Sequence, residues 1–577
     1  MSHEQTIIDF KGLGQRYLFK EPITELVAEH LSEVASVLDK CQSYQQEGYY
    51  VVGYVSYEAA SAFDEGLAVH QKRLGGEYLA YFTVHDKVEK ADFPSQSSLP
   101  TPPRDWKKRV DQTTYEAAIA RIHQEIRQGN TYQVNYTVQL DQELDMDLLQ
   151  VYNHLVLAQD AGYNAYIAHD NFAVLSVSPE LFFETDGNLL RTRPMKGTIN
   201  RGQYLEEDYY NKNWLAQDSK NRAENMMIVD LLRNDMGKVC QIGSVQVEQL
   251  CHVEAYSTVW QMTSSITGYL KDEADDLLSL FRALFPCGSI TGAPKQSTME
   301  IINDLEPEPR GVYCGTIGVL LPDGRRIFNV AIRSLQVTSK EAIYGVGGGI
   351  TWDSKWRDEY EEVDQKSAVL YRQIETFDLI TTAKIENGQM TFYHEHLSRL
   401  RKAAGYFAYP FDENLLKSKI NQCLSDSDAS KVYRLRISLS KSGKFSLSQK
   451  LLTPLPSSYL TLKIAEQEDS NHSLAFRYFK TSQRSHVTVR NEDAIFLNKK
   501  GQVLESSIAN IIIEKDGQWL TPAAKLGLLN GVYRQHLLDQ GKVKESVLNL
   551  EDLKNADKIY ACNAVRGMYQ IHLKVDQ

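Results

Sequence analysis

Residues 192–198 read Thr-Arg-Pro-Met-Lys-Gly-Thr, and a second short motif, Ser178-Pro179-Glu180, precedes them. The carboxylate of Glu180 lies sixteen residues before the amine of Lys196. This separation is typical of two neighbouring strands whose side chains face one pocket. A carboxylic acid and an amine in one pocket can serve as proton donor and nucleophile. We therefore predict an enzyme site built around Glu180 and Lys196.

The segments around this motif predict both strands and helices. Residues 49–57 and 78–84 are aromatic and β-branched runs that predict strands. Residues 92–105 are rich in Pro and Ser and predict an exposed loop. From Tyr115 to Gln128 the apolar residues recur with helical spacing, and Gly129 is a predicted C-cap.

The chain of 577 residues is too long for one hydrophobic core and predicts two or three domains. Strands and helices alternate up to about residue 350, and a new pattern begins at Phe377. We therefore predict one domain at 1–372 and another at 373–577. A helix over 355–374 is predicted to close the first domain, with an apolar stripe of Trp356, Tyr360, Val363, Leu370 and Ile374.

Composition narrows the functional class. The net charge of −12 gives no electrostatic footprint for nucleic acid. No run of about 18 apolar residues occurs, and the N-terminus MSHEQTIIDF lacks a signal-peptide core. We therefore expect a cytoplasmic protein with no nucleic-acid or membrane partner. Seven scattered cysteines form no C-x-x-C pair, which argues against zinc sites and disulfides and favours buried thiols.

Acidic residues at helical spacing form a candidate metal site. Glu359 and Glu362 are three residues apart and share one helix face, with Lys366 one turn further along. Glu224 lies on a second helix that continues as MMIVDLLRND. Carboxylate oxygens suit Mg²⁺, which is bound through few protein groups. An E-x-x-E pair alone is more often a solvated helix face, so the assignment depends on its context.

Glycine-rich motifs supply that context. Residues 285–295 read FPCGSITGAPK and residues 313–318 read YCGTIG, and Arg333 and Gly347-Gly348-Gly349 follow. Glycines let backbone N–H groups approach an anion, and an arginine can bind a carboxylate through two hydrogen bonds. Taken in this order with the upstream motifs, the set resembles the chorismate-binding family over roughly residues 50–372.

The resemblance implies a role for each matching residue. Anthranilate synthases of that family typically carry alanine at the position of Lys196, whereas aminodeoxychorismate synthases carry lysine. By resemblance, Lys196 is the nucleophile and Glu180 the general acid and base. Glu224 and Glu362 would bind Mg²⁺ directly and Glu359 through water, and the metal would hold the ring carboxylate of chorismate. The substrate's carboxylates would be held by Thr291, Gly292, Tyr313, Arg333, Gly347, Gly348, Gly349 and Lys366.

The implied chemistry requires these side chains. Chorismate must lose its 4-hydroxyl, a poor leaving group, and gain nitrogen at that carbon. A carboxylic acid that stays protonated can give its proton to the departing oxygen. An amine that adds at C2 with an allylic shift replaces one hard substitution with two easier steps. Because that amine must be neutral, we expect the pKa of Lys196 to be lowered by burial or a nearby cation.

Two further features narrow the reaction. Gln261 stands where related enzymes commonly carry a histidine, which anthranilate synthases link to pyruvate elimination. Its absence disfavours anthranilate formation but does not prove the alternative. No Gly-x-Cys-x-Gly turn with a downstream His-x-Glu occurs, so the nitrogen is expected from free ammonia or a separate subunit. The resemblance implies a glutamine amidotransferase partner.

The C-terminal segment carries a second set of motifs. A strand pair around Asn387-Gly388 leads into an amphipathic helix. Three motifs follow: VLESSIAN at 503–510, LLNGVYR at 528–534 and CNAVRG at 562–567. The series resembles the fold-type IV pyridoxal-phosphate family over nearly all of residues 377–567, and most closely its aminodeoxychorismate lyases.

This second resemblance also assigns residues. Lys480 would carry pyridoxal phosphate and later move the proton, and Glu505 would pair with the pyridine nitrogen. Free-standing members begin with an extra strand and a Gly-rich stretch before the position of Phe377, and the chorismate-type module takes that place here. A homodimer through the C-terminal domain is one arrangement that the sequence allows. The phosphate would be held by Arg399, Val532, Tyr533, Asn563 and Ala564.

Together the modules predict a bifunctional enzyme of folate synthesis. The first would convert chorismate and ammonia to 4-amino-4-deoxychorismate, and the second, a lyase, would eliminate pyruvate and release 4-aminobenzoate. The predicted fold class is α+β, with an N-terminal α/β sandwich of antiparallel sheets and a C-terminal fold-type IV domain. Three alternatives stay open: another chorismate-utilising synthase (anthranilate, isochorismate or salicylate type) fused to an aminotransferase-like domain, an inactive C-terminal scaffold, and a silent chorismate-binding protein.

Overall fold

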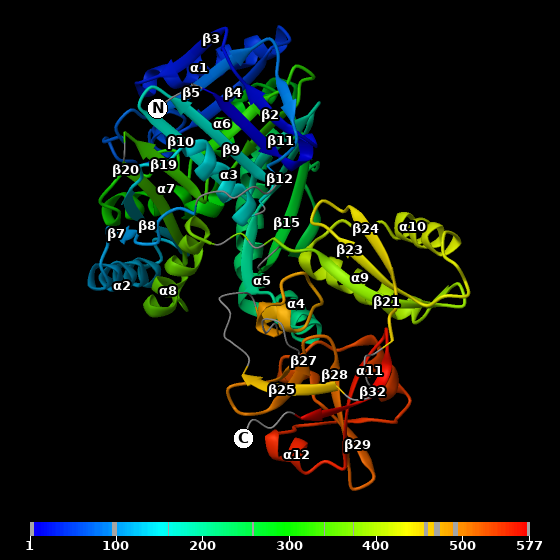
Figure 1. Ribbon diagram of the computed structural model, residues 1–577. Coiled ribbons are helices and arrows are strands. Elements are labelled where there is room, and N and C mark those ends of the chain that lie inside the picture. Colours follow the sequence, from blue (N-terminus) through cyan, green and yellow to red (C-terminus); the bar gives the residue numbers. More distant parts are fainter. Residues whose placement is uncertain are drawn as a thin grey trace. The chain divides into compact units, whose positions relative to one another are not determined.

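The computed structural model describes residues 5–94, 101–159, 161–256, 259–339, 341–372, 374, 376–454, 460–466, 474–487 and 494–573. The chain forms two compact units (Figure 1). The first comprises Met1–Ile199 and Asn213–Ile374, and the second comprises Asn200–Lys212 and Glu375–Gln577. The predicted loop at 92–105 lies partly outside the described residues, and its described ends contain neither helix nor strand.

The first unit is built on two sheets. In one of them β8 lies between β16 and β20 and runs antiparallel to both. The spatial order of this sheet is β16 (Gly292–Ala293), β8 (Gln133–Glu143), β20 (Glu341–Ile350), β19 (Ser334–Thr338), β10 (Phe172–Ser178), β9 (Tyr163–His169), β1 (Thr6–Phe10), β2 (Arg16–Phe19) and β6 (Glu89–Ala91), with β7 (Lys107–Lys108) paired to β8.

The other sheet carries the strands predicted at 49–57 and 78–84, which are confirmed as β4 and β5. These two strands pair in antiparallel register. The spatial order is β13 (Met195–Asn200), β15 (Val259–Tyr269), β12 (Leu189–Arg193), β11 (Leu181–Asp186), β18 (Arg326–Asn329), β17 (Thr316–Leu320), β4 (Tyr50–Val55), β5 (Ala80–His85) and β3 (Thr24–Ala28), with β14 (Gln246–Ala255) paired to β15.

Three large apolar cores and one small cluster around Met262 hold the described part of this unit together. The central core joins the sheets, because Ile8 and Val174 of the first sheet pack with Tyr54 and Ile317 of the second. Two outer cores bury the other sheet faces beneath helices. The predicted α/β sandwich with antiparallel sheets is therefore confirmed. The helices are α2 (Gln112–Gln128), α3 (Leu148–Gln159) and α8 (Trp356–Ser367) on the first sheet and α1 (Leu31–Gln46), α5 (Ser219–Val239) and α6 (Leu277–Leu284) on the second.

Two predicted helices differ in how well their ends were placed. α2 ends at Gln128, and Gly129 caps it in the left-handed conformation with φ 80°, as predicted. α8 ends at Ser367, short of the predicted end at residue 374. The chain then tightens into a 3₁₀ turn over Ala368–Leu370, and this turn still buries apolar side chains in the core. The apolar stripe thus continues beyond the end of the α-helix, which explains why the predicted helix was too long.

β8 presents one apolar and one polar face, and both are buried. Successive side chains of a strand point to opposite faces, so the residues divide by parity. A buried polar face has to find hydrogen-bond partners or ligands for its polar groups. The apolar face carries Val134, Tyr136, Val138 and Leu140, and the polar face carries Gln133, Asn135, Thr137 and Gln139.

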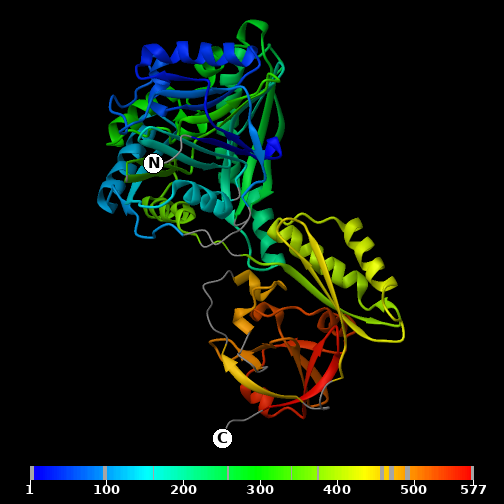
Figure 2. The same ribbon diagram turned by 45° about the horizontal axis from the view of Figure 1, so that its top comes forward.

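The second unit contains a four-stranded sheet covered by two helices (Figure 2). Asn387 and Gly388 have φ values of 52° and 71°, so the predicted hairpin turn is confirmed. The helix predicted after it is α9, whose Leu397, Leu400 and Ala404 are buried. The elements are β22 (Gln389–Met390), β21 (Leu379–Glu386), β23 (Tyr433–Leu439) and β24 (Phe445–Leu451), with α9 (Tyr393–Phe407) and α10 (Glu413–Ser425).

An eight-stranded sheet completes this unit. Besides following the strand order given below, β27, the first strand of that order, also pairs with β28, the sixth. No helix in the described ranges is long and apolar enough to cross a membrane. All seven cysteines are free thiols, and six of them are buried. The strands are β27 (Val503–Ser506), β26 (Ala494–Leu497), β25 (Leu460–Glu466), β32 (Gly567–Leu573), β31 (Lys558–Asn563), β28 (Asn510–Lys515), β29 (Gln518–Pro522) and β30 (Lys544–Ser546), with helices α11 (Val532–Asp539) and α12 (Leu550–Lys554).

Candidate active sites

Glu180 and Lys196 meet in the first unit, although not on neighbouring strands. Glu180 directly precedes β11 and Lys196 lies on β13, and strands β12 and β15 stand between them in the sheet. The predicted neighbouring-strand arrangement is therefore wrong. Pro194 separates β12 from β13 and has no N–H to donate to a ladder, so the chain leaves β12 there and returns on the far side of β15.

Glu180 occupies the environment of a carboxyl group that holds its proton. The residue is 3% exposed, and burial raises its pKa to about 7. The Ser289 hydroxyl and the Lys196 ammonium act in the opposite direction. Its Oε1 atom has no hydrogen-bond partner among the described residues. A protonated carboxyl with a free oxygen can donate to a substrate oxygen.

Lys196 occupies an environment that favours the neutral amine. Burial lowers the pKa of its side chain, and the Lys366 ammonium acts in the same direction. Glu224, Glu180 and Glu362 act against this shift. A lowered pKa increases the fraction of unprotonated amine, which is the species that can add to a carbon atom.

Three glycines of β20 make room for these groups. Gly347–Gly349 pair with Asn135–Thr137 of β8. A Cβ atom on Gly349 would lie 2.9 Å from the Nζ atom of Lys196. The Nζ atom of Lys366 donates to the carbonyl oxygen of Gly347 at 2.7 Å. Side chains on this strand would fill the space beside both lysines.

The predicted metal ligands converge only in part. A Cβ atom on Gly348 would lie 3.4 Å from an oxygen of Glu359 and 4.0 Å from one of Glu362, so these two carboxylates are neighbours. Lys366 forms an ion pair with Glu362 at 2.7 Å and, despite partial burial, holds the pKa of Glu362 below its usual value. Burial raises the pKa of Glu224, which interacts electrostatically with Glu362.

These carboxylates fit a magnesium ion that takes few protein ligands. Within the described residues, no three acidic, histidine or cysteine side chains form a metal-binding group. Mg²⁺ commonly binds through one or two carboxylates and completes its shell with water and substrate oxygens. The Glu359 and Glu362 pair satisfies that requirement, and the assignment of Glu224 stays a prediction.

The other predicted substrate ligands lie at different places. Thr291 is fully buried, and its hydroxyl donates to the carbonyl of Cys287. Gly292 pairs with Val134 of β8. The ring of Tyr313 packs against Gly345 of β20. Arg333, in the left-handed region with φ 52°, donates to the side chain of Gln159 at the end of α3. The described contact of the Arg333 side chain is thus with another protein side chain, and its predicted contact with a substrate carboxylate stays a prediction.

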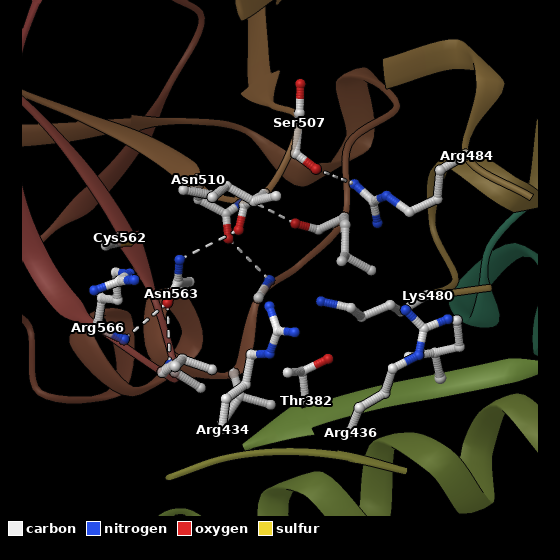
Figure 3. A pocket seen from close by; sticks show the side chains of 18 of the residues that line it. Thr382, Arg434, Arg436, Lys480, Arg484, Ser507, Asn510, Cys562, Asn563 and Arg566 are labelled. Atoms are coloured by element: carbon white, nitrogen blue, oxygen red, sulfur yellow. Dashed lines mark hydrogen bonds between the residues drawn. The ribbon is translucent and has the colours of Figure 1, made fainter. Parts of the chain in front are cut away.

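The second site is a pocket of about 560 Å³ in the second unit. Figure 3 shows that Lys480 projects into it. Burial lowers the pKa of Lys480 well below its usual value, and the cations Arg399 and Arg484 act in the same direction. Glu505 lines the same pocket and is 2% exposed. An amine with a lowered pKa and a buried carboxyl group therefore share this space.

Glu505 is fixed by two contacts. Its Oε1 atom accepts the backbone N–H of Leu529 at 3.0 Å, and its Oε2 atom lies 3.9 Å from Arg484. Burial raises its pKa, whereas Arg484 favours the carboxylate. The side chain is thus held rigidly as an acceptor for a cationic ring nitrogen.

The residues predicted to hold a phosphate fit that group. The Nε atom of Arg399 is buried without a partner among the described residues, and burial lowers the pKa of this arginine to about 10. Helix α11 begins at Val532 with no side-chain cap, so its first N–H groups, including that of Tyr533, are available to an anion. Asn563 and Ala564 line the pocket as well.

The pocket is strongly basic. It is lined by one carboxylate, Glu505, and by seven cationic side chains. Among the residues that the structure describes, Arg434, Arg436 and Lys450 form no ion pair with a carboxylate. Unpaired cations in a pocket favour an anionic ligand. The cationic residues are Arg399, Arg434, Arg436, Lys450, Lys480, Arg484 and Arg566.

Comparison with known families matches both units. Residues 3–372 match the family described as chorismate binding enzyme. The chain belongs to the chorismate binding enzyme family. Residues 378–573 match amino-transferase class IV, a family whose fold implies pyridoxal phosphate.

Relatives of this chorismate binding enzyme include aminodeoxychorismate synthase component 1 of Bacillus subtilis, 39% identical over 261 residues. The match covers 45% of this chain and 55% of that protein, so the chain spans about half the length of this relative. The Escherichia coli protein of the same name is 36% identical over 55% of this chain and 70% of its own. Anthranilate synthase component I from Streptococcus pneumoniae TIGR4 shares the fold, with TM-score 0.55 and 23% identity over 64% of this chain and 93% of that one.

Sequence reasoning missed several polar residues of this chorismate binding enzyme. Gln133 is buried beside Gly349, and Ser289 hydrogen-bonds Glu180. The alternation of polar and apolar residues along β8 was the sequence signal that could have identified Gln133. Gln261, noted only for the histidine it replaces, donates to the carbonyl of Gly197. In the second unit, Arg434 and Arg436 were also missed, because their sequence pattern is that of the solvent-facing residues of a half-exposed strand.

Proposed function

We propose that residues 1–372 exchange the 4-hydroxyl of chorismate for ammonia and form 4-amino-4-deoxychorismate. The observation that carries this proposal is Lys196, an amine of lowered pKa, in the same site as the buried Glu180, whose pKa is raised to about 7. The names of the Bacillus and Escherichia relatives support it. The alternative of a silent binding protein does not explain why an acid and a nucleophile are both tuned for reaction.

The reaction follows from these two groups. Glu180 gives its proton to the departing 4-oxygen, which leaves as water. The Lys196 amine forms a bond to C2 while both ring double bonds shift by one position and the C4–O bond breaks. Ammonia then forms a bond to C4, both double bonds shift back and the C2–N bond to Lys196 breaks. Glu180, now ionised, takes the surplus proton, and the product is 4-amino-4-deoxychorismate.

Substrate and metal binding are assigned to the surrounding residues. Glu224 and Glu362 would hold Mg²⁺ directly and Glu359 through water, and the ion would fix the ring carboxylate of chorismate. The remaining carboxylate contacts are assigned to Thr291, Gly292, Tyr313, Arg333, Lys366 and the backbone of Gly347, Gly348 and Gly349.

Ammonia is assigned to a separate glutamine amidotransferase subunit. The designation component 1 of the Bacillus and Escherichia relatives supports a second component. Free ammonium at high concentration would replace this partner, because the proposed chemistry uses only NH₃.

We further propose that residues 373–577 eliminate pyruvate from 4-amino-4-deoxychorismate and release 4-aminobenzoate. Pyridoxal phosphate supplies an electron sink when it is bound. Its phosphate would be held by Arg399, the α11 N-terminus at Val532 and Tyr533, and Asn563 and Ala564. Glu505 would pair with its ring nitrogen, and Lys480 would remove the proton at C4 of the substrate. Loss of pyruvate then makes the ring aromatic.

The charge of the pocket favours a lyase over a branched-chain aminotransferase. 4-Amino-4-deoxychorismate carries two carboxylates, whereas a branched-chain amino acid carries one carboxylate and an apolar side chain. Arg434, Arg436 and Lys450 add positive charge where an aminotransferase of that type needs an apolar surface. A dianionic substrate therefore fits this pocket better.

Two lysine variants test the assignment. Lys196→Ala should make no product from chorismate and ammonium, yet should convert supplied 4-amino-4-deoxychorismate to 4-aminobenzoate. Lys480→Ala should convert chorismate to 4-amino-4-deoxychorismate and stop there. A 2-oxo acid formed by amino transfer from a branched-chain amino acid, with no 4-aminobenzoate, would refute the lyase proposal.

A further inference from the structure

The side-chain amide of Gln133 is buried without partners. Gln133 opens β8 and is 1% exposed. Neither its Nε2 nor its Oε1 atom has a hydrogen-bond partner among the described residues. An amide buried in this state is costly, because both its N–H groups and its carbonyl have lost water.

This amide lies at the predicted nucleophile. A Cβ atom on Gly349 would lie 2.5 Å from the Nε2 atom of Gln133 and 2.9 Å from the Nζ atom of Lys196, so both nitrogens contact the same glycine. Gln133 also pairs through its backbone with Ala293, next to the predicted ligand Gly292. The backbone of Gln133 therefore lies between the glycine strand β20 and the segment at Gly292, and its amide lies at Gly349.

A second glutamine on the same face shows what a purely structural role requires. Gln139 lies six residues along β8 and is also buried. Its Nε2 atom donates to the carbonyl of Pro309 at 2.7 Å, and its Oε1 atom accepts from Arg109 at 3.0 Å. The buried amide of Gln139 thus has protein hydrogen-bond partners, whereas that of Gln133, beside Lys196, has none among the described residues.

We infer that Gln133 is a positioning residue of the first site: once substrate is bound, its amide bonds the Lys196 amine on one side and an oxygen of the substrate on the other. The inference rests on the proposed function for the identity of that substrate as chorismate. Bound substrate completes the hydrogen bonds that the protein leaves open, and the amide orients the amine towards the ring carbon that it attacks.

The test compares Gln133→Met with Gln139→Met in the full chain. The thermal unfolding midpoint is measured without ligand, the chorismate dissociation constant with Mg²⁺ and no ammonium, and KM and kcat with ammonium. Gln133→Met should leave the midpoint unchanged or raise it, because no protein hydrogen bond is lost. It should weaken chorismate binding and lower kcat/KM by about tenfold or more, the cost of one lost hydrogen bond in a closed site.

Gln139→Met should show the opposite pattern, with a lower unfolding midpoint and an unchanged dissociation constant. Gln133→Leu repeats the test with a second apolar side chain. The inference is overturned if the Gln133 variants lose stability as Gln139→Met does while chorismate affinity and kcat/KM stay at the parent values. A parent protein that binds chorismate without aminating it would refute the proposed function alone, whereas one that binds no chorismate would refute both.

Discussion

Gln261 donates its side-chain N–H to the carbonyl oxygen of Gly197, 2.9 Å away and one residue beyond Lys196. The Oε1 atom of the same amide accepts the hydroxyl of Thr198 at 2.8 Å. A single side chain of β15 therefore holds both residues that follow Lys196, the proposed nucleophile, on β13. A neutral amide engaged in this way supports the position of Lys196. It does not ionise at neutral pH and so does not act as a general acid or base.

Replacing Gln261 should therefore impair the first reaction. Gln261→Met removes both hydrogen bonds and should lower kcat for amination by about tenfold, since each bond contributes on the order of 1 kcal/mol. The initial rate of 4-amino-4-deoxychorismate formation with ammonium measures this. Gln249→Met, on the exposed side of β14, is the matched control and should keep the parent rate. Equal rates for both variants would remove the positioning role of Gln261.

The raised pKa of Glu180 predicts a pH-dependent stability. Between its usual value of 4.5 and about 7, the folded state keeps a proton that the unfolded chain releases. The free energy of unfolding therefore falls as pH rises through this window, by on the order of 3 kcal/mol from this residue. Glu180→Gln should remove that decline. Chemical denaturation at pH 5 and pH 8 measures the difference.

The comparison with the parent protein isolates this effect. Burial also raises the pKa of Glu58 and Glu77 in the same unit, and both remain in the variant. Parallel pH curves for parent and Glu180→Gln would show that the carboxyl of Glu180 titrates normally. In that case its role as a protonated acid near neutral pH would fail too.

Arg436 should contribute to the recognition of a dianionic substrate in the second pocket. Arg436→Gln removes a cation that lines the pocket, and KM for 4-amino-4-deoxychorismate should rise about tenfold while pyridoxal phosphate still binds. Steady-state kinetics and cofactor absorbance measure the two effects. Arg401→Gln, an exposed residue of α9 that pairs with Glu413, should change neither. An unchanged KM for Arg436→Gln would contradict the charge argument.

Chelation should separate the two reactions. Removing divalent ions with EDTA should abolish the conversion of chorismate, because Glu359 and Glu362 are proposed to hold the ion that would orient the substrate carboxylate. The conversion of supplied 4-amino-4-deoxychorismate should continue, and added Mg²⁺ should restore the first reaction. Loss of both activities, or of neither, would count against the metal assignment in the first site.

The sequence predicted the elements with strong local patterns. The hairpin at Asn387-Gly388, helix α2 with its cap at Gly129, and strands β4 and β5 follow from side-chain periodicity and turn chemistry. Strand order did not follow. β15 inserts between β13 and β12, and such a non-local pairing leaves no trace in the residues around Pro194.

The sites show the same division. Lys196 and Glu505 were singled out because they stand in motifs, and the role predicted for Glu505 came from the family resemblance. Gln133 was missed because its importance lies in hydrogen bonds that the protein does not make. Arg434 and Arg436 were missed because their alternation with buried Leu435 and Ile437 is the pattern of an ordinary half-exposed strand.

The most direct test of the account is the identity of the products formed by the purified chain from chorismate with Mg²⁺, pyridoxal phosphate and excess ammonium. The two proposed activities together should yield 4-aminobenzoate and pyruvate in equal amounts from one polypeptide. Anthranilate, or no turnover, would contradict the role of Lys196, and accumulation of 4-amino-4-deoxychorismate would contradict the role of Lys480.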